Sequence, residues 1–324
     1  MVTTLIRRAI QAGFVILAMT LIVFVGINVI GNPVDILINP DLNQAERAQV
    51  IANLGLDKPL WQQYLSFLHG LTQGNFGKSF VYHKPALDVI LERLPATLEL
   101  ALCAMVIAIV VGIPLGLYAG LYPRRISSRI IMTGSIFGFS LPTFWVGLML
   151  ILVFAVELGW LPSNGRGDTV MLLGVNWSFL TTNGLSHMLL PALNLALFKT
   201  SLILRLTRAG VQEVIAQDFV KFAHAKGLHE SRVIFVHVLK NLMIPVVTII
   251  GLEFGSLIAY SVVTESIFGW PGMGKLIIDS INLLDRPVIV AYLMMMVVLF
   301  VSLNFIIDIC YTLLDPRVRL EGKG

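Results

Sequence analysis

The sequence predicts an all-α integral membrane protein with about six transmembrane helices. Of its 324 residues, 56% are hydrophobic and only 13% are charged, and the mean hydropathy is +0.84. A soluble domain of this length needs a larger share of polar residues to cover its surface. Several apolar runs also reach the roughly 20 residues that a helix needs to cross a bilayer. The composition therefore excludes a soluble globular protein.

The N-terminal part of the chain is expected to hold one span and a long external segment. Arg7 and Arg8 precede an apolar run that ends near residue 30. This run is longer than the hydrophobic core of a typical signal peptide, so residues 1–30 are predicted to form an uncleaved first span. Residues 31–96 are polar and rich in proline, and they are too long for a simple connector. We expect them to form a small external, helical subdomain.

The next part of the chain, residues 97–314, is predicted to form a core of five spans. The first of these is expected to be broken by Gly112, Pro114 and Gly116. A loop with few charges at 157–186 is expected to form an exposed, partly ordered cover. The five spans are predicted at about 97–121, 130–156, 187–204, 242–264 and 287–314, followed by a tail at 315–324.

The basic residues predict the orientation of the spans. The net charge is +4, but the basic side chains are distributed among the loops rather than gathered into one patch, so the lipid bilayer and not nucleic acid is the expected partner. Most of them fall near the N-terminus, at Arg124 and Arg125, in the loop 205–241 and in the tail. Short cytoplasmic loops carry an excess of Lys and Arg. Both termini and the loop 205–241 are therefore expected to be cytoplasmic.

The loop 205–241 is predicted to contain a short amphipathic helix. Asp218 is a suitable N-cap, and Phe219, Phe222 and Ala223 recur at helical spacing on one face. Lys226 suits the negative C-terminal end of such a helix. A short helix with an apolar face on the water side of a membrane protein is suited to a groove in a partner.

A glycine turn is expected to end this short helix. Gly227 can adopt the left-handed conformation beyond a helix end, and Leu228 can fold its side chain back over the last turn. A second helix is predicted to begin at 229–231 and to run past Asn241 and Pro245 into the next span. Two helices that meet at a turn are therefore expected.

This loop resembles the cytoplasmic coupling loop of binding-protein-dependent ABC permeases, in the dipeptide, oligopeptide and nickel branch. The match includes an Ala-x-Ala-Lys-Gly run followed by spaced His, Asn and Pro. Lys221 and Phe222 depart from the Glu-Ala pair of the wider superfamily. The stretches 54–68, 74–80 and 93–100 resemble the first external loop of the same branch. The matching loop residues are Phe219, Ala223, Ala225, Lys226, Gly227, His237, Asn241 and Pro245.

The resemblance implies a bacterial inner-membrane permease subunit of an ATP-driven importer of di- or oligopeptides, which performs no chemistry itself. It implies three kinds of partner: a second homologous permease, two cytoplasmic ABC ATPases, and a periplasmic or lipid-anchored solute-binding protein. Nickel or glutathione are alternative cargoes. A secondary transporter is the rival class, but no inverted repeat is evident. The residues implied to couple to the ATPases are Phe219, Phe222, Ala223, Ala225, Lys226, Gly227, Leu228 and His237.

A second motif follows the fifth predicted span. Residues 264–274 resemble the Glu-x-x-Phe-x-x-Pro-Gly-x-Gly segment in the last external loop of the same branch. A Pro-Gly turn at Pro271 and Gly272, beside Phe268 and Trp270, predicts an exposed re-entrant finger at the mouth of the pathway that contacts a docking protein. The alternative interpretation is an interfacial aromatic anchor.

Two ionisable residues fall inside predicted spans. Lys199 and Glu253 lie mid-way along the fourth and fifth spans. An unpaired charge in hydrocarbon costs about 3 kcal/mol or more, so the two side chains are expected to face inward or to meet. They are candidates for the translocation pathway. The alternative role is a structural contact between helices.

The chain is not expected to be an enzyme, and no cofactor or metal is expected. Neither HExxH nor GxSxG occurs, and the histidines are scattered. The run from Gly269 to Lys275 has the spacing of a phosphate-binding loop, but Leu276 replaces the hydroxyl residue that would hold Mg²⁺. Energy for transport must therefore come from other subunits.

Overall fold

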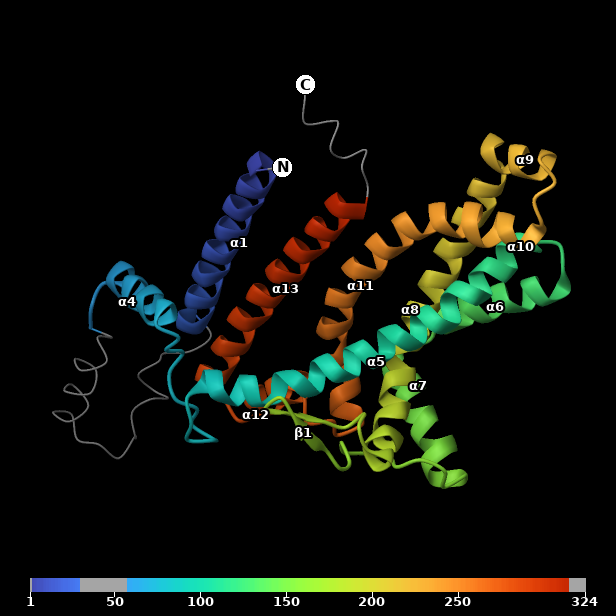
Figure 1. Cartoon of the computed structure of the whole chain (residues 1–324). Coiled ribbons are helices and arrows are strands. Elements are labelled where there is room, and N and C mark those ends of the chain that lie inside the picture. Colours follow the sequence, from blue (N-terminus) through green and yellow to red (C-terminus); the bar gives the residue numbers. More distant parts are fainter. Residues whose placement is uncertain (1, 30–56, 315–324) are drawn as a thin grey trace. The chain divides into compact units, whose positions relative to one another are not determined.

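The computed structural model describes residues 2–29 and 57–314, which fold mainly as helices (Figure 1). The chain divides into two compact units, Met1–Glu92 with Asp279–Ser302 and Arg93–Ile278 with Leu303–Gly324. The predicted tail at 315–324 and the first part of the expected external segment lie outside the described residues. Three helices contribute residues to both units: α5 (Ala86–Leu121), α12 (Met273–Asn282) and α13 (Arg286–Leu314).

The first unit packs around a small apolar cluster. It contains α1 (Val2–Val29) and α4 (Leu60–Thr72). Val23 of α1 is buried with Val290 and Met294 of α13, and side chains of α4 pack against the same cluster. Helix α4 lies within the segment that was expected to form an external subdomain.

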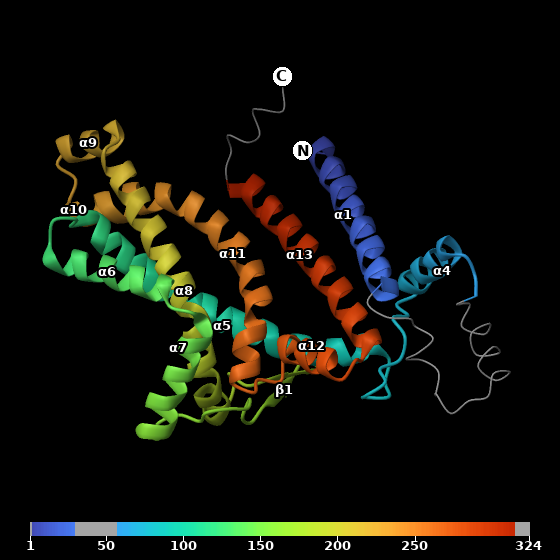
Figure 2. The ribbon, with the colours of Figure 1, turned by 180° about the vertical axis from the view of Figure 1, so that it is seen from behind.

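The second unit holds the candidate site. Strands β1 and β2 pair antiparallel, so the expected cover loop contains a hairpin in an otherwise helical chain. Both ribbon views show this hairpin and α9 at opposite ends of α8 (Figures 1 and 2). The elements are α6 (Ile126–Ser140), α7 (Thr143–Leu150), the π-helical segment η1 (Ile151–Glu157), β1 (Val170–Leu172), β2 (Val175–Trp177), α8 (Thr182–Ile215), α9 (Asp218–Ala225), α10 (Glu230–Arg232), the π-helical segment η2 (Val233–Val238) and α11 (Leu239–Ile267).

Within residues 2–29 and 57–314, four helical stretches are long and apolar enough to cross a membrane. They are the helices α5 and α8, Pro245–Ile267 of α11 and Arg286–Ile307 of α13. Helix α6 and the α7–η1 helix form a pair bent by 105°, which makes five if the pair is one span. The apolar stretch Ile10–Gly26 of α1 is shorter. The expected first span, which α1 would form, therefore stays a prediction.

Several predicted span boundaries were wrong. Helix α5 begins at Ala86 rather than near Thr97, and it continues through Gly112, Pro114 and Gly116 without the expected break. The expected third span is bent where Pro142 caps the start of α7. Helix α8 extends to Ile215 instead of ending near Leu204. Proline and glycine are tolerated inside membrane helices because neighbouring helices compensate for them, so these residues did not end α5.

The glycines of α5 form its contact with α8. Gly112, Gly116 and Gly120 recur every four residues and share one face. A Cβ atom at Gly116 would lie 2.6 Å from the carbonyl oxygen of Leu204, and one at Gly120 would lie 2.7 Å from the Cβ of Val211. Small residues at this spacing let two membrane helices approach closely, which is how such helices associate without a hydrophobic driving force.

We predict that Gly116→Ala destabilises the protein whereas Gly134→Ala does not. The new methyl group at position 116 meets the backbone of α8, which cannot move aside, and such overpacking costs about 1–3 kcal/mol. A Cβ atom at Gly134 of α6 meets nothing within 4 Å. Thermal unfolding of the purified protein in detergent, followed by size-exclusion chromatography, measures the difference. Equal melting temperatures for the two variants would contradict the close α5–α8 contact.

Candidate functional site

Helix α9 is held against the end of α8 by an apolar cluster. Val220 and Ala223 of α9 are buried against Val211 of α8, Val233 of η2 and Leu242 of α11. Because the cluster joins α9 to residues of α8, η2 and α11, α9 is fixed to the ends of two membrane helices. A displacement of α9 would therefore be transmitted to both.

The outer face of α9 differs from the predicted one. Phe219 and Phe222 are 43% and 61% exposed, whereas Ala223 is 3% exposed. The prediction that all three share an outward face was wrong for Ala223, because Val220 and Ala223 form the inward stripe. Lys226 Nζ lies 4.6 Å from the centre of the Phe222 ring. The face that α9 offers to a partner thus consists of two phenylalanines beside a cation.

The predicted N-cap of α9 was also wrong. The cap position is Gln217, and Asp218 is the first helical residue. The Asp218 carboxylate instead accepts a hydrogen bond from Lys221 Nζ at 2.8 Å. This contact and the charge of Lys221 hold the pKa of Asp218 below its usual value.

The turn after α9 has the predicted geometry. Gly227 has φ of +73°, its N–H donates to the His224 carbonyl at 2.9 Å, and the Leu228 N–H donates to the Ala223 carbonyl at 3.3 Å. These two bonds are those of a Schellman motif. Leu228 also packs against the apolar cluster, as expected. The glycine turn is therefore confirmed.

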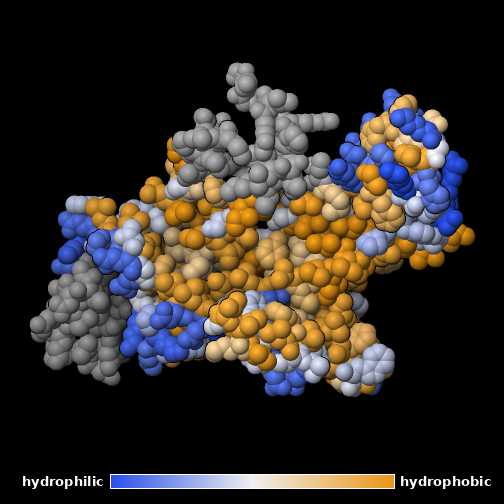
Figure 3. All heavy atoms as spheres, in the orientation of Figure 1, coloured by the Kyte–Doolittle hydropathy of each residue, from blue (hydrophilic) through white to orange (hydrophobic). Residues whose placement is uncertain are grey.

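The following helix begins where it was expected. His229 caps α10, and its Nδ1 accepts from the Ser231 N–H at 3.4 Å. His237 lies further on, in η2, where its carbonyl accepts from Asn241 Nδ2 at 2.6 Å. Of the predicted coupling residues, those at 219–228 lie together on α9 and its turn, while His237 lies on the next helical element. The surface over α9 and α10 is mostly hydrophilic (Figure 3).

Lys199 and Glu253 meet between α8 and α11. Lys199 Nζ forms an ion pair with Glu253 and donates to Ser256 Oγ at 2.6 Å. The Lys199 side chain is only 4% exposed, whereas that of Glu253 is 26% exposed. Lys199 Nζ also lies 5.8 Å from the ring centre of Tyr260, which is itself exposed. The two side chains were expected to face inward or to meet, and the structure shows that they meet.

Ser256 and Tyr260 were not predicted to belong with this pair. Their positions i+3 and i+7 from Glu253 place all three residues on one face of α11. Ser256 and Tyr260 could therefore have been predicted from the sequence by their helical spacing from Glu253. The result is a polar stripe on α11 that is bridged to α8 by one lysine.

The predicted finger at 268–272 does not face outward. Phe268 and Trp270 are 1% and 0% exposed, so both the exposed finger and the interfacial anchor were wrong. Trp270 Nε1 donates to the Ala96 carbonyl of α5 at 2.9 Å. A Cβ atom at Gly272 would lie 2.4 Å from Glu265 Oε2, so only glycine fits beside this carboxylate, and Pro271 before it is half-buried. The segment thus contacts α5 through the indole N–H of Trp270.

Buried Glu265, the first residue of the Glu-x-x-Phe motif, was given no role of its own from the sequence, and it organises this segment. Its carboxylate accepts from Thr97 Oγ1 at 2.7 Å, from the Gly274 N–H at 2.7 Å and from the Lys275 N–H at 3.1 Å. A buried carboxylate is tolerated when its oxygens are hydrogen-bonded in this way. Glu265 therefore ties the segment after α11 to α5.

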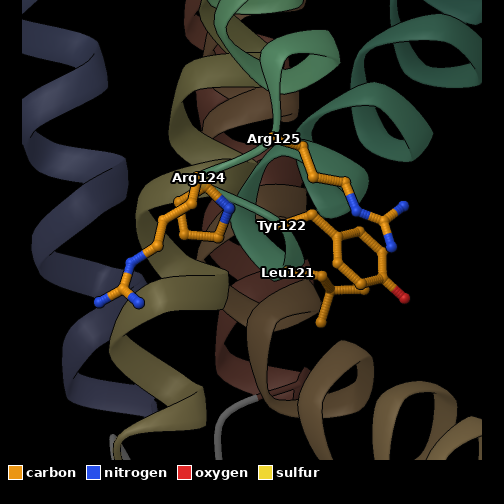
Figure 4. Close-up of a pocket in the computed structure, with 5 residues that line it drawn as sticks. Leu121, Tyr122, Arg124 and Arg125 are labelled. Carbon is orange, nitrogen blue, oxygen red and sulfur yellow. The ribbon is translucent and has the colours of Figure 1, made fainter.

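The turn between α5 and α6 is basic. Leu121, Tyr122, Pro123, Arg124 and Arg125 line an open pocket of about 410 Å³. Arg125 lies over the Tyr122 ring at 4.2 Å, and Arg124 points to the other side (Figure 4).

Across the described ranges, no group of three or more His, Cys, Asp or Glu side chains is placed to hold a metal ion.

Comparison with known families covers most of the chain. Residues 112–320 match the family described as the binding-protein-dependent transport system inner membrane component, and residues 1–101 match the N-terminal region of such membrane components. The chain belongs to this family of permeases. The resemblance seen in the sequence is thereby confirmed, and the permease is a non-catalytic membrane subunit.

Curated relatives align with the permease over nearly its full length. The di/tripeptide transport system permease protein of Pseudomonas aeruginosa (strain UCBPP-PA14) is 39% identical over 93% of this chain and 94% of its own. The oligopeptide transport system permease protein of Bacillus subtilis (strain 168) is 39% identical over 98% and 100%. The glutathione transport system permease protein of Escherichia coli O1:K1 / APEC is 34% identical over 99% and 100%.

A solved structure shares the fold of the permease. The MetNI methionine ABC transporter, in an inward-facing conformation, superposes with a TM-score of 0.56 and 15% identity, covering 71% of this chain and 98% of the other. At this identity the likeness concerns the fold alone.

We predict that Lys199→Met and Glu253→Gln each destabilise the permease and that the double variant recovers much of the loss. Breaking a buried pair costs about 3–5 kcal/mol because one charge stays unpaired. Lys199→Met leaves the partly exposed Glu253 unpaired and should cost less than Glu253→Gln, which leaves the buried Lys199 unpaired. Melting temperatures of the four proteins form a double-mutant cycle. Strictly additive losses would show that the two residues do not interact.

Proposed function

We propose that this chain is the permease subunit of an ATP-driven importer that moves di- or oligopeptides into the bacterial cytoplasm. The observation that carries the proposal is α9, an exposed helix with Phe219 and Phe222 outward, which is fixed by its inner face to the ends of two membrane helices. The relatives named for dipeptide, tripeptide and oligopeptide transport support the cargo.

In this proposal, a cytoplasmic ATPase receives α9 in a groove. Phe222 and Phe219 fill the groove, and Lys226 lies at its rim. When ATP closes the pair of ATPases, the groove carries α9 with it, and the apolar cluster transmits the displacement to α8 and α11. A second permease, a second ATPase and an external solute-binding protein complete the importer.

The same displacement would reach the polar stripe on α11. Lys199 joins α8 to Glu253 and Ser256 at mid-span, so a shift of one helix against the other changes this contact. We place Lys199 and Glu253 at the translocation pathway, because Glu253 and Tyr260 remain partly open rather than fully packed. The positive charge of Lys199 balances the negative charge of Glu253, so the stripe has no net charge. A neutral stripe suits a zwitterionic peptide better than a free metal cation.

We assign the α9 end of α8 to the cytoplasm of a bacterial inner membrane, together with both termini. Helix α8 has 34 residues, which corresponds to about 50 Å, whereas the hydrocarbon core is about 30 Å thick. The elements that precede and follow α8 therefore lie on opposite sides of the bilayer. The basic turn at Arg124 and Arg125 supports the same orientation.

We predict that the importer, reconstituted with its ATPases and solute-binding protein in liposomes, takes up labelled di- and tripeptides when ATP is present on the ATPase side. Glutathione is the second candidate cargo, because a glutathione permease is among the relatives. Nickel ion is the third. Uptake of glutathione or nickel without uptake of other peptides would overturn the proposed cargo class.

We predict that Gly227→Val uncouples ATP hydrolysis from uptake and that Gly227→Asn does not. The Cβ position at Gly227 is open, so the effect is one of backbone conformation. Valine tolerates a φ of +73° poorly, whereas asparagine tolerates the left-handed region. With valine, the turn should open, and the orientation of α9 relative to α8 should change. Substrate-stimulated ATPase activity measures coupling, and normal stimulation in Gly227→Val would show that the turn is incidental.

A further inference from the structure

The hairpin before α8 presents an unusual apolar tip. Val170, Met171 and Leu172 are 46%, 69% and 49% exposed, and Leu173 is 95% exposed. Leu173 and Gly174 have φ of +55° and +77° and form the two-residue turn of the hairpin. Asparagine or glycine normally occupies the first of these positions, because a branched apolar residue is strained there. An exposed leucine kept in this conformation points to a contact with another molecule.

The hairpin is held in a fixed position by one arginine. Arg166 Nη2 donates to the Asn176 carbonyl of β2 and to Glu99 of α5, both at 2.6 Å, and Arg166 Nε donates to Ser178 Oγ at 2.9 Å. Glu99 also accepts from the Phe179 N–H at 2.8 Å, and its side chain is 1% exposed. A buried carboxylate with this many donors holds one geometry, so the hairpin is fixed to α5.

The segment at 268–270 supports the hairpin loop from within. The Gly165 N–H donates to the Phe268 carbonyl at 2.9 Å, and Arg166 lies 5.7 Å from the Trp270 ring centre. Phe268 and Trp270 were expected to contact a docking protein, but they are buried and cannot do so. They instead support a loop whose tip is exposed.

The position and charge of the tip restrict its partner. The hairpin lies at the end of α8 opposite to α9, which the proposed orientation places outside the cell membrane. Residues 169–181 contain no charged side chain, so charge complementarity favours an apolar surface over charged lipid headgroups. A fixed geometry benefits docking to a shaped surface, because less conformational freedom is lost on binding. A lipid anchor does not require such a geometry.

We propose that the hairpin tip, Val170–Gly174, is a docking element for the solute-binding protein, with Met171 and Leu173 entering an apolar depression on that protein. The proposal rests on the proposed function, in which an external binding protein delivers the cargo. The docking contact was expected at the segment 268–272, which is buried. The proposal assigns this contact to the loop that the segment supports.

The test measures the affinity of the reconstituted importer for the fluorescently labelled solute-binding protein of the proposed importer. Changing Met171→Ser together with Leu173→Ser should weaken binding about tenfold or more, as the loss of central apolar contacts does in other interfaces. Leu173→Asn should also weaken binding, although asparagine suits the positive φ, so misfolding would not explain the loss. Leu180→Ser is the matched control, because Leu180 is 44% exposed in the same loop but lies outside the hairpin.

The outcomes separate this proposal from the proposed function. Wild-type affinity in both hairpin variants would overturn the docking role. A loss seen in lipid nanodiscs but absent in detergent would also overturn it, because that pattern indicates a membrane anchor. A wild-type importer that binds the solute-binding protein through the hairpin but takes up no peptide would refute the cargo and leave the docking role standing.

Discussion

The close contact between α5 and α8 is the constraint on which the second unit depends. In a bilayer the hydrophobic effect does not drive helices together, so small residues that allow backbones to approach supply the packing. Gly116 and Gly120 provide that approach, with α8 atoms where their side chains would be. Helix α8 then positions three features along its length: the hairpin before it, Lys199 in the middle and α9 after it.

Two buried carboxylates hold the loop of Arg166 and the segment at 268–275 to α5. Glu99 of α5 holds the loop of Arg166, and Glu265 of α11 holds the segment at 268–275 through Thr97 of α5 and two backbone N–H groups. Such networks fix geometry more than they add stability, because burying the charges has a cost of its own. In the permease they join the hairpin loop and the segment at 268–275 to α5 within the second unit.

The sequence predicted features set by local chemistry. The apolar runs located the membrane helices, and the glycine turn at Gly227 followed from backbone conformation. The cost of an unpaired charge predicted that Lys199 and Glu253 either face inward or meet. It failed where burial depends on distant residues. Trp270 looked exposed because its acceptor, the Ala96 carbonyl, is far away in the sequence. Gly116 looked like a break because its contact with α8 is not visible in α5 alone.

The central claim is that α9 passes the movement of an ATPase to α8 and α11. The most direct measurement places a photo-crosslinking amino acid at Phe222 in the complete importer and identifies the product after illumination with and without ATP. The claim predicts a crosslink to the ATPase subunit through the exposed face of α9, and no such product with the same amino acid at Tyr260. Efficient labelling of lipid or of another permease from position 222, without an ATPase product in either nucleotide state, would contradict it.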